Sequence, residues 1–329
     1  MGRGSANVED QLRSAIAALE GLRIVDPTAA QAVRNDINKA IEEFLRSLLA
    51  TERGLADAKS VPASALLQSF LLSFASRAAS RERLHIFTTN YDRLIELGCD
   101  EAGLRMIDRF VGTLRPLFRN TRIELDYHYN PPGIRGEPRF MEGVVRLTKL
   151  HGSLDWRFDP EERRIHRAGI PFGAEEDHPG LPESPVDTVM IYPNPAKDVE
   201  TTQYPYAELF RDFASATCRP NAVVVTYGYG FGDDHINRVL LDMLSVPSAH
   251  LVIIAFELDA RIKGFLEKTR PAQVSLLAGP HFASLQRLVE DYLPKPALDY
   301  ITGRMTELLR HRPMEGGLHE QSAQAGTAE

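Results

Sequence analysis

The feature that most constrains the fold is a short apolar segment that ends abruptly in polar residues. Residues 84–88 (LHIFT) have the composition of a β-strand, and residues 89–92 (TNYD) follow without a spacer. After Asp92 the apolar residues recur at helical spacing. A strand that runs into polar groups and a helix start is typical of open α/β sheets, which bind ligands at the carboxyl ends of their strands.

The same pattern recurs later in the chain. Apolar strands are predicted at 144–150, 222–227 and 251–256; they end respectively at His151, in the glycine-rich segment 228–235, and at Glu257. The segment 222–227 is largely β-branched, which is typical of a parallel strand covered on both faces. Strands that alternate with helices predict an α/β fold with a doubly wound, Rossmann-like parallel sheet.

The remaining segments predict the domain organisation. Residues 1–83 are expected to form a helical N-terminal part, because amphipathic spacing indicates helices at 7–21, 28–50 and 64–79. Residues 84–311 are expected to form the core, with insertions at about 103–143, a lobe, and 157–187, an aperiodic surface excursion. Residues 312–329 are predicted to be a flexible tail. Smaller elements are expected at 189–192 and 273–277 (strands) and at 206–213, 236–244, 284–293 and 298–310 (helices).

Composition excludes several classes of function. The net charge is −7, and the 38 Lys and Arg residues form no long basic run, so direct nucleic-acid binding is not expected. No apolar run approaches the roughly 18 residues that a membrane helix requires. The N-terminal residues lack the apolar core of a secretory signal. A cytoplasmic protein without a membrane segment is therefore expected.

The glycine-rich segment suits the binding of phosphate or ribose. Gly228, Gly230 and Gly232 lie between a predicted buried strand and a helix, where bare backbone N–H groups can approach ligand oxygens. The alternative is a tight turn that needs positive φ angles. Asp233 and Asp234 would repel a phosphate beside them, so at least one is expected to cap the following helix or to meet a ribose hydroxyl.

The residues after the other two strands also have two interpretations each. Asn90 can hold a ribose hydroxyl or an attacking water, but an Asn in this place is often a turn former. Asp92 can cap the following helix or accept from a ligand carboxamide. His151 can take a proton from a water during attack at an anomeric carbon, or it can be a satisfied buried histidine. Gly152 leaves space for close approach of a ligand.

Three ordered motifs together resemble the SIR2-like family, and in particular its bacterial defence branch. They are 88–92 (TTNYD), 149–156 (KLHGSLDW) and 227–237 (YGYGFGDDHIN), and residues 191–193, Lys197 and 205–213 are similar as well. The resemblance covers residues 84–295. It implies that Asn90 and His151 are catalytic. Asn90 would meet the nicotinamide ribose and its water, and Asp92 would lie near the carboxamide, with Thr89 beside it.

The resemblance also implies the remaining binding residues. Gly228, Gly230, Phe231 and Asp233 correspond to the nucleotide loop of the family, and Glu257 falls where the adenosine ribose is met. NAD⁺ is then the substrate. Protein-deacylating members carry a four-cysteine zinc module, which Cys99 and Cys218 alone cannot form, so no zinc and no lysine deacylation are expected.

Family members begin with an apolar strand and a Gly-Ala-Gly-x-Ser loop, which residues 1–5 echo only faintly. This strand is expected to be absent from the chain or supplied otherwise. The leading interpretation is an NAD⁺ hydrolase that acts as the effector of an antiphage defence complex. A catalytically impaired scaffold subunit and a protein ADP-ribosyltransferase are the alternatives. By the same resemblance, the expected partners are further copies of the chain and a separate sensor or HerA-type ATPase ring.

Overall fold

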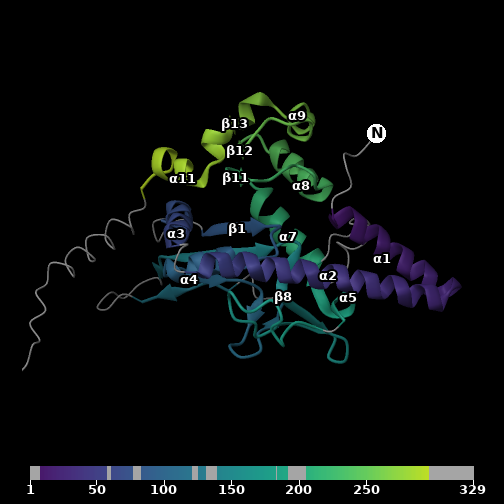
Figure 1. Ribbon diagram of the computed structural model, residues 1–329. Coiled ribbons are helices and arrows are strands. Elements are labelled where there is room, and N and C mark those ends of the chain that lie inside the picture. The colour runs from purple at the N-terminus through teal and green to yellow at the C-terminus, as the bar shows by residue number, and fades with distance from the viewer. Residues whose placement is uncertain are drawn as a thin grey trace, which may run out of the picture.

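A computed structural model describes residues 8–57, 61–76, 83–120, 125–130, 139–182, 184–191 and 205–295. It is a mixed α/β fold in which Rossmann-like parallel strands are flanked by helices (Figure 1). The predicted helix 298–310, the predicted tail 312–329, and Lys197 lie outside the described residues. None of the helices in the described part combines the length and apolar composition needed to cross a membrane.

The N-terminal part consists of helices at the predicted places: α1 (Val8–Val25), α2 (Pro27–Ala56) and α3 (Val61–Ala75). The Asp26 carboxylate caps α2 by accepting from the backbone N–H of Thr28 and Ala29, and Pro27 occupies the first helical turn, where no N–H is needed. One stripe of α2 is buried against α1 and the rest of the core; it comprises Ile37, Ile41, Leu45 and Leu49.

The first parallel sheet has the order β1–β7–β2, where β1 is Leu84–Thr88, β7 is Val144–Lys149 and β2 is Arg105–Ile107. Alternate side chains of β1 face opposite helices, as the period of a strand requires. Ile86 packs with α3 and with α4 (Leu94–Glu101), whereas the Phe87 ring lies 4.8 Å from that of Phe213 in α7 (Tyr206–Thr217). Because β2 pairs with β7, the first residues of the predicted lobe at 103–143 belong to this sheet.

The second parallel sheet has the order β11–β12–β13, where β11 is Val223–Tyr227, β12 is His250–Ala255 and β13 is Val274–Ala278. Helices α8 (Asp234–Ser245) and α9 (Ala260–Leu266) connect these strands, and all of them lie at the top of Figure 1. The sheets share helices, since the Phe70 ring of α3 lies 5.4 Å from that of Tyr227.

The strand β11 differs from its prediction. Among the described strands it lies at the edge of its sheet, and the Val223 and Val225 side chains are 64% and 38% exposed, so the expectation of burial on both faces is wrong. A run of β-branched residues indicates that a segment suits an extended conformation, but it does not determine whether neighbouring elements cover both faces.

A third sheet is antiparallel and lies below the first parallel sheet (Figure 1), with the order β10–β8–β9–β4–β3. It contains β8 (Gly152–Asp159), which directly follows His151, and β9 (Arg164–Arg167); its other strands are β10 (Val189–Ile191), β4 (Leu117–Phe118) and β3 (Phe110–Val111). The predicted surface excursion at 157–187 is therefore wrong, because it contributes β9 and the fully buried Ile165. A strand with a single apolar side chain among charged residues carries no clear periodic signal.

Short elements complete the described fold. Strands β5 (His128–Tyr129) and β6 (Arg139–Phe140) pair with each other. The others are α5 (Pro185–Thr188), a 3₁₀ turn (Pro271–Gln273), α10 (Pro280–Ala283), α11 (Leu285–Arg287) and a π-helical turn (Leu288–Tyr292).

Candidate functional site

The register of the first parallel sheet brings Asn90 and His151 to the same edge. Thr88 of β1 is paired with Lys149 of β7, and the Leu150 N–H donates to the Thr88 carbonyl at 2.8 Å. Asn90 and His151 each stand two residues beyond that last pair. Asn90 is exposed, whereas His151 is 7% exposed. Two residues that are far apart in sequence therefore emerge at adjacent strand ends, as the sequence predicts.

The turn that carries Asn90 is closed by short side chains. The Asn90 N–H donates to Thr88 Oγ1 at 3.0 Å, and Thr89 is half-buried beside it. Asp92 Oδ1 accepts from the Leu94 N–H at 3.1 Å, which satisfies an N–H at the start of α4. Asp92 therefore satisfies an N–H in the first turn of α4 from the position before the N-cap residue, Arg93, whose side chain makes no capping bond.

His151 is held by a carboxylate from the second half of the chain. Its Nε2 lies 2.9 Å from Asp233 Oδ2, and both side chains are buried. Its Nδ1 is buried and has no hydrogen-bond partner among the described residues. When Nε2–H donates to the carboxylate, the lone pair of the neutral imidazole lies on Nδ1. With this tautomer the ring is oriented and Nδ1 carries the lone pair that a general base requires, but protein atoms enclose Nδ1 in this structure, so a substrate must open a path to it.

Asp233 has a second role at the start of α8. Its Oδ1 accepts from the N–H of His235 at 3.0 Å and of Ile236 at 3.5 Å, so it is the N-cap of this helix. Both carboxylate oxygens are thus engaged by protein groups. The sequence correctly predicts a helix cap here, but it gives no signal for the pairing with His151.

The glycine-rich loop before α8 combines open backbone with a firm anchor. A Cβ added to Gly228, whose φ is +67°, or to Gly230 would meet no atom within 4 Å. In contrast, Phe231 has φ of +50° and a 4% exposed ring that lies 4.7 Å from the rings of Tyr229 and Phe265. The Phe231 side chain therefore belongs to the core, and its backbone is the part left to meet a ligand.

Glu257 emerges at the same edge of the second sheet as this loop. Tyr227 is paired with Ile254, and Gly230 and Glu257 each follow that pair by three residues. Glu257 is exposed, and the neighbouring Phe256 side chain is 65% exposed. The structure therefore brings Gly230 and Glu257 to one edge, and it brings Asn90 and His151 to another. The contact of Asp233 with His151 connects the edge that carries Gly230 and Glu257 to the edge that carries Asn90 and His151.

The described residues contain no group of three or more His, Cys, Asp or Glu side chains placed to hold a metal ion. Cys99 is buried, Cys218 is exposed, and neither forms a disulfide.

Sequence reasoning misses the buried charges behind this edge. Lys149 is 2% exposed, and Glu52 and Glu96 are also buried. Charged side chains are almost never fully buried unless they are paired, so the sequence favours an exposed position for each. The only available signal is the place of Lys149 two residues before His151, at the end of a predicted strand.

Comparison with known families supplies one match. The model of a family described as "SIR2-like domain" matches residues 84–270, which is more than half of the chain. The matched segment includes both strand edges described above. A search of curated proteins finds no match.

Proposed function

Because the chain belongs to the SIR2-like domain family, whose members use NAD⁺, we propose that it is an NAD⁺ hydrolase. The reaction breaks the bond between nicotinamide and ribose and releases nicotinamide and ADP-ribose. One observation supports this proposal above the others. Asn90 and His151 stand at equal distance beyond a pair of parallel strands, and the contact of His151 Nε2 with Asp233 suits the tautomer in which Nδ1 is the acceptor.

The binding roles follow from what each group offers. The open backbone at Gly228 and Gly230 suits the pyrophosphate or a ribose, and the exposed Glu257 carboxylate suits the hydroxyls of the adenosine ribose. Asp92 keeps one oxygen for its capping bond, and the other can accept from the carboxamide NH₂, next to Thr89. Asp233 acts through His151, since its own oxygens are engaged.

The chemical step needs an oriented water and a base. As the C–N bond breaks, its electron pair leaves with nicotinamide, and positive charge develops on the anomeric carbon and ring oxygen of the ribose. The Asn90 side chain can donate and accept at once, so it fixes the water near that carbon. The water oxygen forms the new C–O bond while its proton passes to His151 Nδ1.

Alanine variants at the two catalytic positions test this assignment. Asn90→Ala and His151→Ala should each lower nicotinamide release at least about 10²-fold, since positioning and proton transfer are worth that much. Asn35→Ala and His128→Ala, at exposed positions on α2 and β5, are the matched controls. Size-exclusion profiles should be unchanged. Wild-type rates in both site variants would contradict the assignment.

The biological role that we propose is that of an effector in an antiphage defence complex, in which the chain assembles with further copies and with a HerA-type ATPase ring. The support is the resemblance of the three motifs to the defence branch. The test follows cellular NAD⁺ during phage infection, and nicotinamide and ADP-ribose in the purified complex. ADP-ribose retained on protein would indicate a transferase, and no turnover with partner and activator would indicate a scaffold.

A further inference from the structure

A buried ammonium contacts both of the turns that carry Asn90 and His151. Lys149 is the last residue of β7 and is 2% exposed. Its Nζ donates to Ser153 Oγ at 3.0 Å, to Glu96 Oε1 at 3.1 Å and to the Tyr91 carbonyl at 3.4 Å, and also to the carbonyl of Asp92.

These partners belong to both turns of the site. The carbonyls of Tyr91 and Asp92 directly follow Asn90, and Ser153 lies two residues after His151. The two turns also share backbone bonds, since the Leu150 N–H donates to Thr88 O at 2.8 Å and the Leu154 N–H to Tyr91 O at 3.0 Å. One side chain therefore contacts the backbone that carries the water-orienting Asn and the turn that carries the base.

We propose that Lys149 is a positioning residue, which holds the Asn90 turn and the His151 turn in one fixed register for catalysis. None of its contacts is with the side chain of Asn90 or His151. Its effect on catalysis therefore passes through the backbone of the two turns. The catalytic part of this inference rests on the proposed NAD⁺ hydrolysis, while the structural part does not.

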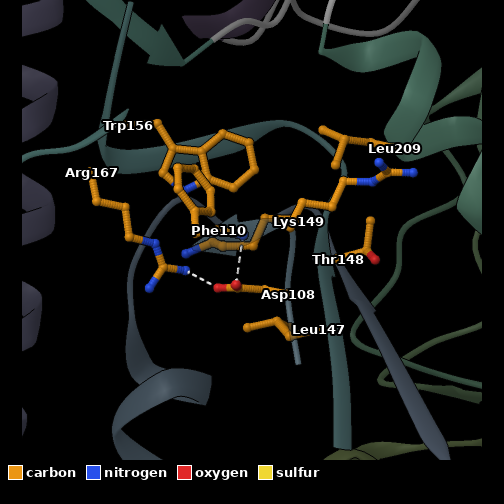
Figure 2. A pocket seen from close by; sticks show the side chains of 9 residues that line it. Asp108, Phe110, Leu147, Thr148, Lys149, Trp156, Arg167 and Leu209 are labelled. Atoms are coloured by element: carbon orange, nitrogen blue, oxygen red, sulfur yellow. Dashed lines mark hydrogen bonds and ion pairs between the residues drawn. The ribbon is translucent and has the colours of Figure 1, made fainter. Parts of the chain in front are cut away.

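The surroundings exclude a direct role for Lys149 in ligand binding. Its side chain lines a cavity of about 10 Å³ with Trp156 and Arg167 (Figure 2), which has room for about one water molecule. Burial raises the pKa of the Glu96 carboxyl, and the charge of Lys149 opposes that rise. Lys149 and Glu96 thus form a buried ion pair, which leaves no room for a ligand.

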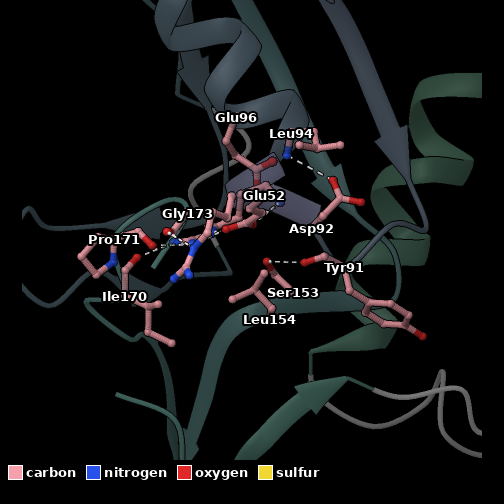
Figure 3. A network of polar contacts seen from close by, with 12 residues as sticks. Glu52, Tyr91, Asp92, Leu94, Glu96, Ser153, Leu154, Ile170, Pro171 and Gly173 are labelled. Carbon is pink, nitrogen blue, oxygen red and sulfur yellow. Dashed lines mark hydrogen bonds and ion pairs between the residues drawn. The ribbon is translucent and has the colours of Figure 1, made fainter. Parts of the chain in front are cut away.

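A second ion pair fastens the Asn90 turn from the side of α2. Arg93 donates to the fully buried Glu52 carboxylate through its N–H, Nε and Nη2, at 2.9, 3.1 and 2.6 Å. Its Nη2 also donates to the Pro171 carbonyl at 3.0 Å. The contacts of Arg93 hold the Asn90 turn only, whereas the contacts of Lys149 reach both turns. Figure 3 shows partners from both sets, with Glu52 and Pro171 on one side and Tyr91 and Ser153 on the other.

The experiment must separate positioning from stability. Lys149→Met alone leaves the buried Glu96 carboxylate without its cationic partner and destabilises the fold for that reason. The double variant Lys149→Met/Glu96→Met removes both charges and keeps apolar volume, a replacement that buried ion pairs often tolerate. Its matched control is Arg109→Met/Asp212→Met. That pair is also buried, with N–O distances of 2.6 Å, and Arg109 also donates to backbone carbonyls, those of Arg119 and Asn120.

Two readouts are taken on the full-length chain. They are compared between variants whose midpoints of urea denaturation match. The first is hydrogen exchange of the Leu150 and Leu154 amides, which should become at least about tenfold faster in Lys149→Met/Glu96→Met and stay unchanged in the control. The second is nicotinamide release from NAD⁺, in which kcat should fall at least about 100-fold with KM within about threefold of wild type, since the loss is one of orientation.

The two readouts make the outcomes distinguishable. The role of Lys149 is overturned if the Leu150 and Leu154 amides of Lys149→Met/Glu96→Met exchange as slowly as in wild type. It is also overturned if they exchange fast while kcat stays at the wild-type value. If the wild-type chain itself releases no nicotinamide with its partners present, the proposed hydrolysis fails, and the exchange of Leu150 and Leu154 alone decides whether Lys149 holds the two turns together.

Discussion

The two parallel sheets each present a turn to the site, but they hold it by different means. In the first sheet, buried charges fasten the turns, through Lys149 with Glu96 and through Arg93 with Glu52. In the second sheet, a neutral side chain anchors the glycine loop, since Asn237 Nδ2 donates to the Phe231 carbonyl at 3.0 Å, and the one carboxylate involved, Asp233, caps α8 and contacts His151. Under the proposed function, the ionic side holds the groups that are oriented for the chemical step, and the glycine loop of the second sheet offers open backbone for binding.

The hydrogen bond between His151 and Asp233 joins the two sides. Because Asp233 also caps α8, the orientation of the base depends on a helix of the second sheet. Five substitutions in four tests probe this comparison, from the largest expected effect to the smallest.

Asp233→Asn should have the largest effect. The amide oxygen still caps α8, but the NH₂ group now donates to His151 Nε2, so the imidazole proton moves to Nδ1 and the base is blocked. We expect kcat for nicotinamide release to fall by about 10²–10⁴-fold with little change in the free energy of unfolding.

Asp259→Asn is the matched control for this variant, because Asp259 caps α9 by accepting from the Ile262 N–H at 2.8 Å and has no histidine partner in the described hydrogen bonds. Equal kcat values for the two variants would show that the contact between His151 and Asp233 does not orient the base.

Valine truncations compare the covered and the open sheet. Val145→Ala in β7 should lower the free energy of unfolding by about 2 kcal/mol, since Val145 is fully buried and its removal leaves a cavity. Val223→Ala in β11 should change it by less than about 0.5 kcal/mol, because that side chain is 64% exposed. Urea denaturation measures both. A large cost at Val223 would indicate that β11 is covered in solution.

Asn237→Leu tests the neutral side. It removes the bond to the Phe231 carbonyl and the contact of Asn237 Oδ1 with the Tyr229 hydroxyl at 2.9 Å, so the glycine loop loses its anchor. We expect KM for NAD⁺ to rise about tenfold, the worth of roughly one hydrogen bond, while kcat stays within about threefold. Steady-state kinetics distinguish this from the kcat effect of the Lys149 variant. A pure loss of kcat would contradict the division between the two sides.

The last test concerns the pH dependence of stability, whose effect is measured per unit of pH. Burial, and then the charges of Arg146 and Arg219, lower the pKa of His85 to about 3. The unfolded chain binds a proton at this residue below the ordinary histidine pKa of 6.5, while the folded chain binds it only near 3. The free energy of unfolding therefore falls as the pH falls through this range, by at most about 1.4 kcal/mol per pH unit from this group.

His85→Gln should make that decline shallower, since glutamine does not titrate but can still bond with Thr148 Oγ1, which His85 Nε2 approaches at 2.9 Å. Urea denaturation at several pH values between 7 and about 4 measures the slope. Parallel curves for wild type and variant would contradict a depressed pKa at His85.

Sequence reasoning succeeds where a residue type and its chain position coincide with a local motif. Apolar strands and helical periodicity locate β1, β7, β11 and β12, and the register of parallel strands then brings Asn90 and His151 together. The same local patterns locate Gly228 and Gly230 in the loop between β11 and α8. These parts depend on patterns of a few neighbouring residues.

The parts that could not be predicted depend on contacts between distant segments. His151 and Asp233 are 82 positions apart, and nothing in either neighbourhood specifies their bond. From the sequence, Lys149 is expected to be a solvated charge. Its partners, Glu96 and the carbonyls of the turn, become evident only in the folded structure. The strand β9 has one apolar side chain, so its pairing with β8 becomes evident only in three dimensions.

The most direct test of the account is a short incubation of the wild-type chain, assembled with its partners, with NAD⁺ in H₂¹⁸O. If Asn90 and His151 direct a water to the ribose, nicotinamide and ADP-ribose should appear in equal amounts, and the ADP-ribose should carry one ¹⁸O atom at the anomeric carbon. His151→Ala and Asp233→Asn should reduce both products together. Nicotinamide released without labelled ADP-ribose, or with the ADP-ribose bound to protein, would contradict the account.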